Sequence, residues 1–334
     1  MYIPVPVFSD RFSYRLRNIA LFTQCCARVG LRRMRHGARL HWDYISEAAA
    51  EFLRRQTEIS YAMSPNDGRE FTRAFTFSSP YSDQVHMETI RDGALRGYKI
   101  TPKEDLRSLT LLFLHGGGFF YGTSTAYCTM ASLFAVTMRA TTYMPDYRLA
   151  PEHPFPAALE DSLASYRALL DSGIPPSKLI VCGDSAGGNL TMSLLIALRE
   201  NHLPQPALAL PFCPWVDLSN SGETMRSNDV TDWIFFNMLE KCARAYSNGL
   251  DLCDPRLSPA FADFADTAPM YIQAGKNEIL YDQIMAFYQR AKASGWNVTL
   301  DEFEDAIHDL QAWGEATPAS RAALACIAEK TALL

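Results

Sequence analysis

One serine lies in a sequence context where its hydroxyl could act as a nucleophile. Residues 183–187 read Gly-Asp-Ser-Ala-Gly, a Gly-x-Ser-x-Gly pattern centred on Ser185. The apolar run 179–181 precedes it and leucines at helical spacing follow it, so we expect a strand that turns sharply into a helix at the serine. Glycines would relieve the crowding in such a turn, and the first N–H groups of the helix would point toward developing negative charge. The alternative is a glycine-rich turn with a serine that caps the helix, and the flanking strand and helix favour the nucleophile.

A serine hydroxyl is a weak nucleophile until a base accepts its proton, so the chain must also supply a histidine and an acid. In this chain order both should follow the serine, each just after a strand. His308 follows the predicted strand 297–303. His202, the only other histidine after Ser185, lies near the end of the predicted helix that follows the serine and could not reach back to it. We therefore predict that His308 is the base.

Two acids follow the predicted strand 270–274. Glu278 lies in the loop directly after the strand, and Asp282 lies one helical turn later, so both could share a helix face. Acids adjacent to the histidine are too close in sequence to orient it from a separate loop. We predict that Glu278 orients the imidazole, and Asp282 is the alternative.

A glycine-rich segment could bind the oxyanion of a tetrahedral intermediate. Residues 115–118 read His-Gly-Gly-Gly after the apolar run 108–114. Glycines leave backbone N–H groups unshielded, and the N–H of Ala186, the residue after the serine, would complete the site. A phosphate-binding loop is the alternative, but no Lys-Ser/Thr pair follows and no Gly-x-Gly-x-x-Gly spacing fits.

Strand and helix patterns alternate from about residue 85. We expect strands at 95–100, 108–115, 140–146, 178–183, 207–212, 270–274 and 297–303, and helices at 157–171, 185–200, 279–294 and 315–330. This alternation predicts a mostly parallel sheet covered by helices on both faces. The stretch 213–265 breaks the alternation and resembles an insertion.

The first 60 residues differ in charge from the rest. Residues 11–39 contain eight arginines and no Asp or Glu, and apolar residues at helical spacing predict two or three helices. The favoured interpretation is a set of helices that lie over the domain with their arginines in solvent. An anionic membrane or an acidic partner is the alternative.

The composition bounds the class of protein. The 334 residues are 48% hydrophobic and 20% charged, which is typical of a globular protein and excludes disordered, collagen-like and coiled-coil chains. A net charge of −6 argues against a nucleic-acid partner, and no apolar run is long enough for a membrane span. The chain opens without a basic, signal-like segment, and its eight cysteines include no Cys-x-x-Cys pair, so we expect a cytoplasmic protein without a zinc or redox motif.

Several segments together resemble the hormone-sensitive-lipase-like family of α/β-hydrolases, in particular the bacterial carboxylesterases. They are His-Gly-Gly-Gly at 115–118, Asp-Tyr-Arg-Leu-Ala-Pro-Glu-His-Pro-Phe-Pro-Ala at 146–157, Gly-Asp-Ser-Ala-Gly-Gly at 183–188, Pro-Trp-Val-Asp-Leu at 214–218 and Asp-Pro-Arg-Leu-Ser-Pro at 254–259. The resemblance covers about residues 85–330. It implies an α/β-hydrolase fold, with a mostly parallel eight-stranded sheet flanked by helices and a helical cap. The expected parts are a cap segment at 1–60, a catalytic domain at 85–334 and a cap insertion at 213–250.

The resemblance also implies roles for individual residues. Ser185 would be the nucleophile and His308 the base, and the oxyanion donors would be Gly116, Gly117 and Ala186. Many members have Asp-Pro-Leu at the acid position, whereas residues 278–280 here read Glu-Ile-Leu. The 30 residues that separate Glu278 from His308 fit the spacing of the family.

The expected activity is that of a serine hydrolase, which cleaves carboxylic esters of small to medium acyl chains through an acyl-enzyme without a metal or organic cofactor. An amidase or formamidase on the same triad is one alternative. A ligand-binding receptor that has lost hydrolysis is another, and the presence of His308 argues against it. We expect a small-molecule ester as the partner, no nucleic acid and no membrane contact through the arginine-rich start. A homodimer is left open.

Overall fold

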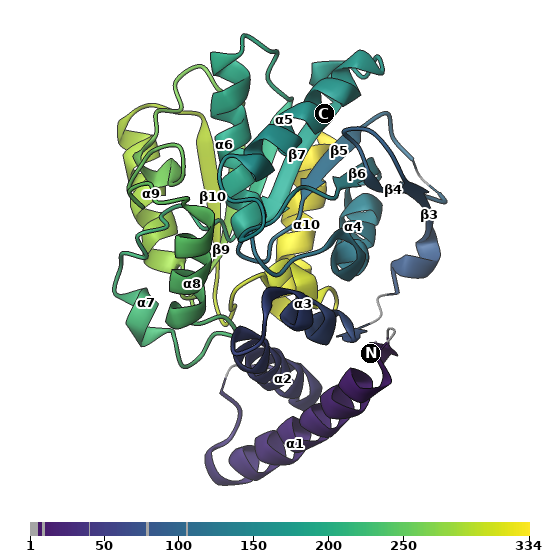
Figure 1. Ribbon diagram of the computed structural model, residues 1–334, viewed down its shortest axis with the longest axis vertical. Helices are drawn as coiled ribbons and strands as arrows, with labels where there is room; N and C mark the ends of the chain where they lie inside the picture. The colour runs from purple at the N-terminus through teal and green to yellow at the C-terminus, as the bar shows by residue number, and fades with distance from the viewer. Residues whose placement is uncertain (1–5, 9–10, 40, 78–79, 105) are drawn as a thin grey trace.

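An eight-stranded sheet forms the centre of the computed structural model, which describes the chain except for residues 1–5, 9–10, 40, 78–79 and 105 (Figure 1). The strand order is β10-β9-β8-β7-β5-β6-β4-β3. The strands are β3 Val85–Ile90, β4 Gly97–Pro102, β5 Thr110–Leu114, β6 Thr141–Pro145, β7 Leu179–Asp184, β8 Leu208–Phe212, β9 Met270–Gly275 and β10 Val298–Phe303. Strands β5 to β10 pair in parallel, and β4 runs antiparallel to both β6 and β3. The mostly parallel eight-stranded sheet is therefore confirmed.

Helices cover both faces of this sheet. They are α4 Ser124–Met138, α5 Ala157–Asp171, α6 Ala186–Glu200, α9 Tyr281–Ala293 and α10 Pro318–Ala332. Side chains alternate along β5, so Leu112 joins one apolar core with residues of α5, α6 and α9. Phe113 joins the other core with residues of α4 and α10. Burial on both faces explains why the sequence of β5 is continuously apolar.

The remaining elements lie outside these layers. They are β1 Pro6–Phe8, α1 Phe12–His36, α2 Tyr44–Tyr61, α3 Pro65–Arg73, β2 Phe75–Phe77, α7 Thr224–Ser227 and α8 Phe236–Tyr246, with short 3₁₀ turns at Ser82–Gln84, Pro176–Lys178, Pro259–Phe261 and Leu310–Trp313. Helices α1 and α2 lie together at the bottom of Figure 1, with α3 between them and the sheet. Among the described residues, no helix is both long and apolar enough to cross a membrane.

Most predicted elements lie within a few residues of the observed ones. Helix α4 and the strands β1, β2 and β3 were not predicted, and of these strands β3 belongs to the eight-stranded sheet. Five of its six side chains are exposed or partly exposed, because β3 is the last strand at one edge of the sheet. An edge strand of this kind lacks the apolar alternation that identifies a half-buried strand.

Candidate active site

Ser185 occupies a strained turn between β7 and α6. Its backbone has φ 54° and ψ −117°, a conformation that residues other than glycine rarely adopt. Two hydrogen bonds fix this turn, since the Ser185 N–H donates to the Phe212 carbonyl at 2.9 Å and the Trp215 N–H donates to the Ser185 carbonyl at 3.0 Å. The strain is therefore balanced by bonds to the chain that leaves the neighbouring strand β8.

Both glycines of the Gly-x-Ser-x-Gly pattern are required by close backbone contact. A Cβ atom at position 187 would overlap the carbonyl oxygen of Leu114, at the end of β5. A Cβ at position 183 would overlap the same oxygen and the carbonyl group of Gly187. The turn can therefore pass beside β5 only if both positions lack side chains.

His308 and Glu278 form a buried hydrogen-bonded pair. His308 lies in the loop after β10 and Glu278 in the loop after β9, and their Nδ1 and Oε2 atoms are 2.9 Å apart. The Gly275 N–H donates to the other carboxylate oxygen of Glu278 at 2.8 Å. A carboxylate at Nδ1 favours the tautomer whose proton is on Nδ1, which leaves a lone pair on Nε2.

Asp282, the alternative acid, makes different contacts. Its Oδ2 atom accepts hydrogen bonds from the N–H groups of Glu223 at 2.8 Å and Thr224 at 2.9 Å. These two residues stand at the start of α7, so the carboxylate satisfies backbone donors of that short helix. The structure brings Glu278, and not Asp282, into hydrogen-bond contact with His308.

Burial dominates the electrostatics of Glu278. It raises the pKa of the carboxyl to about 8, and hydrogen bonds from the Gly275 N–H and the Cys213 thiol oppose this rise. The potential ligand atoms of Cys213, Glu278 and His308 all lie within 4.8 Å of one another. Thiolate, carboxylate and imidazole are zinc ligands, but a metal here would have to replace the proton that joins Nδ1 to Oε2.

Backbone contacts bring the serine turn to the same place. Phe212, which accepts the Ser185 N–H, is the neighbour of Cys213, whose thiol lies within 4.8 Å of the ligand atoms of Glu278 and His308. The His308 Nε2 atom is buried and makes no hydrogen bond to any described residue, Ser185 included. Its nearest acidic neighbour is the Asp309 Oδ1 atom at 3.4 Å. Contacts between nucleophile and base are often loose before substrate binds.

The glycine-rich loop differs from expectation at one position. The Gly116 N–H donates to the Asp184 Oδ1 atom at 3.0 Å, so it is already occupied and does not fit the oxyanion role that the family resemblance implied. Within the part of the chain that the structure describes, the N–H groups of Gly117, Gly118 and Ala186 have no hydrogen-bond acceptor. Gly117 and Gly118 have φ values of 103° and 63°, a backbone path that side chains disfavour.

Asp232 is a site residue that the sequence did not indicate. Its Oδ2 atom accepts the Ile279 N–H at 2.8 Å, and its Oδ1 atom accepts the His308 N–H at 3.2 Å. One buried carboxylate thus joins the loop of the acid to the loop of the histidine. Burial raises the pKa of Asp232 to about 6, while His308 and the N–H donors lower it. Asp232 lies in an irregular segment, where no local pattern marks it.

Helix α2 supports this segment from outside. The Arg54 guanidinium donates to the carbonyls of Asp229 at 2.6 Å, Ile234 at 2.9 Å and Asp232 at 3.3 Å. Its charge also lies 4.8 Å from the centre of the Phe235 ring. The N-terminal helices are therefore connected to the triad loops through residues 229–235.

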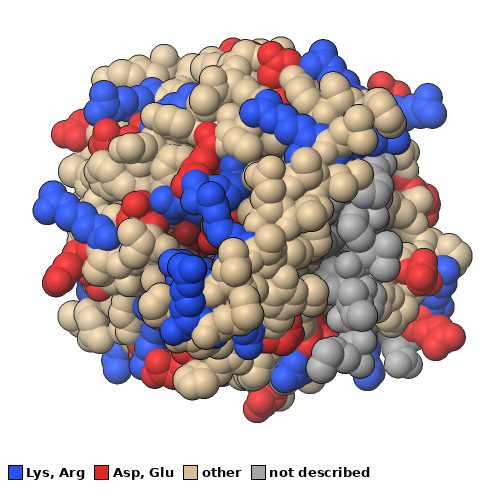
Figure 2. Space-filling model, turned by 90° about the horizontal axis from the view of Figure 1, so that it is seen from below, with Lys and Arg blue, Asp and Glu red and all other residues tan. Residues whose placement is uncertain are grey.

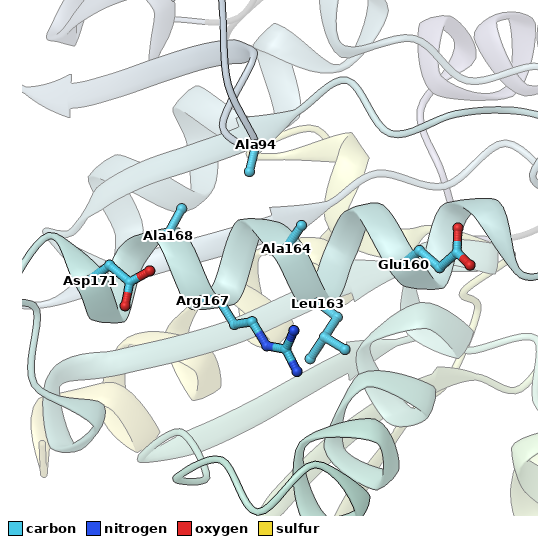
Figure 3. A pocket seen from close by; sticks show the side chains of 7 residues that line it. All are labelled: Ala94, Glu160, Leu163, Ala164, Arg167, Ala168 and Asp171. Carbon is cyan, nitrogen blue, oxygen red and sulfur yellow. The ribbon is translucent and has the colours of Figure 1, made fainter.

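A hollow of about 430 Å³ lies elsewhere, along α5 (Figure 3). It is lined by Ala94, Glu160, Leu163, Ala164, Arg167, Ala168 and Asp171. These residues come from α5 and the β3–β4 loop, which contribute none of the side chains described above. The candidate active site therefore lies at the strand ends and shares no side chain with this hollow.

Comparison with known proteins agrees with the geometry. Residues 111–312 match a family model described as alpha/beta hydrolase fold. An acetyl-hydrolase of Streptomyces hygroscopicus is 35% identical over 216 residues, which cover 64% of this chain and 72% of the relative. An esterase of Acinetobacter venetianus is 28% identical over 290 residues, which cover 86% of this chain and 95% of the relative.

A solved structure extends the likeness to the fold. It is a crystal structure of an esterase from the bacterial hormone-sensitive lipase family, 31% identical, with a TM-score of 0.76 over 84% of this chain and 95% of that one. The sheet, the serine turn and these similarities together show that the chain belongs to the alpha/beta hydrolase fold family and, within it, to the bacterial hormone-sensitive lipase group of esterases.

Proposed function

We propose that the chain is a carboxylic ester hydrolase in which Ser185 is the nucleophile, His308 the general base and Glu278 the acid that orients it. The observation that carries this proposal is the 2.9 Å contact between His308 Nδ1 and Glu278 Oε2, together with a serine held in a strained strand-to-helix turn. The esterase names of its relatives support the same reaction.

The reaction follows from these positions. The Ser185 hydroxyl oxygen attacks the ester carbonyl carbon while its proton moves to His308 Nε2, and Glu278 stabilises the imidazolium that forms. The oxyanion of the tetrahedral intermediate accepts hydrogen bonds from the N–H groups of Gly117, Gly118 and Ala186. His308 then gives its proton to the departing alcohol, which leaves an acyl group on Ser185. Water, deprotonated by His308, attacks this acyl-enzyme and releases the carboxylic acid.

The substrate class is an ester with a small to medium acyl chain. The relative from Streptomyces hygroscopicus is called an acetyl-hydrolase, which supports the short end of that range. Residues 1–60 and 213–250 together form the proposed cap over a catalytic domain at 85–334, and the hydrogen bonds of Arg54 to residues 229–234 support this division. No step above requires a metal or an organic cofactor. The absence of a nucleic-acid partner and the cytoplasmic location stay predictions from the sequence, and the oligomeric state stays open.

A series of p-nitrophenyl esters from acetate to octanoate, with a p-nitroanilide of matched acyl chain, tests the proposal. We expect hydrolysis of the short esters and a loss of at least about 10⁴-fold in kcat for Ser185→Ala. Ser172→Ala, a serine on the C-terminal side of α5, is the matched control and should retain full activity. If folded Ser185→Ala keeps its activity, the proposal is wrong. If the anilide is cleaved faster than the ester, the amidase alternative holds.

A further inference from the structure

Helix α1 presents a row of apolar side chains to solvent. Phe12, Leu16, Ile19, Leu31 and Met34 have exposed fractions of 71%, 51%, 41%, 54% and 77%. Their positions, with the exposed Thr23 and Ala27 between them, are separated by three or four residues and therefore follow one face of the helix. We call these seven residues the α1 stripe.

The opposite face of α1 holds the helix to the molecule. Cys25 and Val29 are buried there, and the rings of Phe22 and Phe52 pack edge to face with centroids 5.6 Å apart. Asn18 donates to the Phe71 carbonyl at 3.0 Å. Since α1 is anchored on this side and the side chains of the α1 stripe are exposed, the stripe faces away from the body. Helix α1 itself lies at the bottom of Figure 1.

Positive charge accompanies the stripe. Helix α1 contains six arginines and no acidic residue. Arg17, Arg28 and Arg35 are 11 and 7 residues apart, so they follow a common edge beside the α1 stripe. Arg28 has an exposed side-chain fraction of 62%, although its guanidinium also lies 3.6 Å from Glu51. Figure 2 shows blue Lys and Arg side chains beside tan surface on this side, with red Asp and Glu side chains among them.

The surrounding segment is also basic as a whole. Residues 11–73 contain twelve arginines and six acids, a net charge of +6 in a chain whose total is −6. An apolar helix face bordered by arginines is the surface that binds at the interface of an anionic bilayer, where the apolar side chains enter the headgroup region and the guanidinium groups contact phosphates. In contrast to the interpretation favoured from the sequence, in which these helices only cover the domain with their arginines in solvent, we propose that α1 docks on an anionic lipid surface and lies in its plane.

A second copy of the chain fits this surface less well. Two α1 helices paired along their stripes in antiparallel order would bring Arg17 of one against Arg28 of the other. Helix α1 has no acidic residue to compensate this repulsion. Lipid phosphates supply the complementary charge that a second helix lacks.

Docking through α1 would place the lipid surface on the side of the molecule that carries the triad loops. The Trp42 indole, in the α1–α2 loop, donates to the Asp305 carbonyl at 2.7 Å, three residues before His308. The Trp42 and Trp313 rings also pack with centroids 4.8 Å apart. This orientation would bring ester substrates in the lipid surface close to the triad, a consequence that rests on the proposed function. The docking of α1 itself does not depend on the proposed function.

Co-sedimentation of the full chain with vesicles tests the proposal. We expect binding to vesicles of equal parts phosphatidylglycerol and phosphatidylcholine at low salt, weaker binding at about 0.5 M salt, and little binding to phosphatidylcholine alone. The triple variant Leu16→Gln, Leu31→Gln, Met34→Gln should lower the partition coefficient about tenfold or more. The double variant Arg28→Gln, Arg35→Gln should lower it several-fold and weaken its salt dependence.

Matched controls separate folding and catalysis from docking. Leu333→Gln and Arg91→Gln remove an exposed apolar and an exposed basic side chain elsewhere and should bind as the unaltered chain does. All of these variants should hydrolyse a soluble ester at the unaltered rate, which shows that they are folded, and Ser185→Ala should bind vesicles normally.

The proposal is overturned if the unaltered chain does not bind anionic vesicles or if the triple variant binds them equally well. A dimer that the triple variant dissociates, without vesicle binding, would assign the α1 stripe to a second copy. Binding to polyglutamate but not to vesicles would assign it to an acidic protein.

Discussion

The proton on the His308 ring decides whether Ser185 can be activated. Glu278 Oε2 lies 2.9 Å from Nδ1 and keeps the proton on Nδ1, so that Nε2 can accept the serine proton. Burial alone would favour the neutral acid, and the donors that surround Glu278, the Gly275 N–H and the Cys213 thiol, act in the opposite direction. The orientation of one imidazole thus rests on several hydrogen bonds.

The two candidate acids should differ sharply when they are neutralised. Glu278→Gln replaces the acceptor by an amide whose NH₂ group favours the wrong tautomer, and we expect kcat on p-nitrophenyl butyrate to fall by about 10²–10⁴-fold. Asp282→Asn weakens only the contacts at the start of α7, and should cost about 1 kcal/mol of unfolding free energy with kcat changed by less than about threefold. Steady-state kinetics and urea unfolding measure both. A larger loss of kcat in folded Asp282→Asn would contradict the assignment.

The triad loops are held together by an element that lies outside the sheet. Asp232 bonds the backbone of both loops, and Arg54 of α2 bonds the segment that carries Asp232. The Trp233 indole adds a hydrogen bond to the His308 carbonyl at 2.9 Å. The N-terminal helices therefore support the geometry of the histidine loop through residues 229–235.

Asp232 acts as a positioning residue in this account. Asp232→Asn keeps an acceptor for the His308 N–H, but its NH₂ group can face the Ile279 N–H, so we expect a loss of about 1–3 kcal/mol in unfolding free energy. We also expect kcat to fall about 10–100-fold with KM changed much less, together with a shift of the acidic limb of the pH–kcat profile. Asp263→Asn, at an exposed acid, is the control. Reduced stability with an unchanged kcat and pH profile would make the role of Asp232 structural only.

Sequence patterns predicted the elements whose local signals are strong. The apolar run before Ser185 and the leucines after it identified the β7–α6 turn, because strand and helix periods change within five residues. The pattern could not show that the Asp184 side chain occupies the Gly116 N–H, since this contact joins residues 68 positions apart. Asp232 was missed for the same reason, since its partners are 47 and 76 positions away. Helix α4 was not predicted, because it is apolar on most of its surface and therefore has no clear amphipathic period.

At the scale of the whole molecule, buried titratable groups couple stability to pH. Burial raises the pKa of Asp184 to about 7 and that of Glu278 to about 8. Burial lowers the pKa of His115 to about 4, and the ring stacks on Tyr147 with centroids 4.3 Å apart. The folded protein thus keeps the proton of Asp184 up to about pH 7, whereas the unfolded chain loses it near pH 4 and His115 affects stability only below about pH 6.5.

Asp184 should therefore lower the free energy of unfolding as the pH rises from about 4 to 7. Over this range the folded protein still holds the proton of Asp184 and the unfolded chain has lost it, so each rise in pH favours the unfolded chain. The slope from Asp184 is at most about 1.4 kcal/mol per pH unit, and Asp184→Asn should remove it. Urea unfolding at a series of pH values measures it. A pH dependence that is unchanged in Asp184→Asn would contradict the raised pKa of Asp184.

Covalent labelling by diethyl p-nitrophenyl phosphate, followed by peptide mass spectrometry, tests directly whether Ser185 is the activated nucleophile. This reagent phosphorylates an activated serine whose base and oxyanion donors are in place. We expect one diethylphosphoryl group per chain, located on Ser185, with ester hydrolysis lost in proportion and labelling greatly slowed in His308→Ala. A label on another residue, or full hydrolysis by a chain whose Ser185 is phosphorylated, would contradict it.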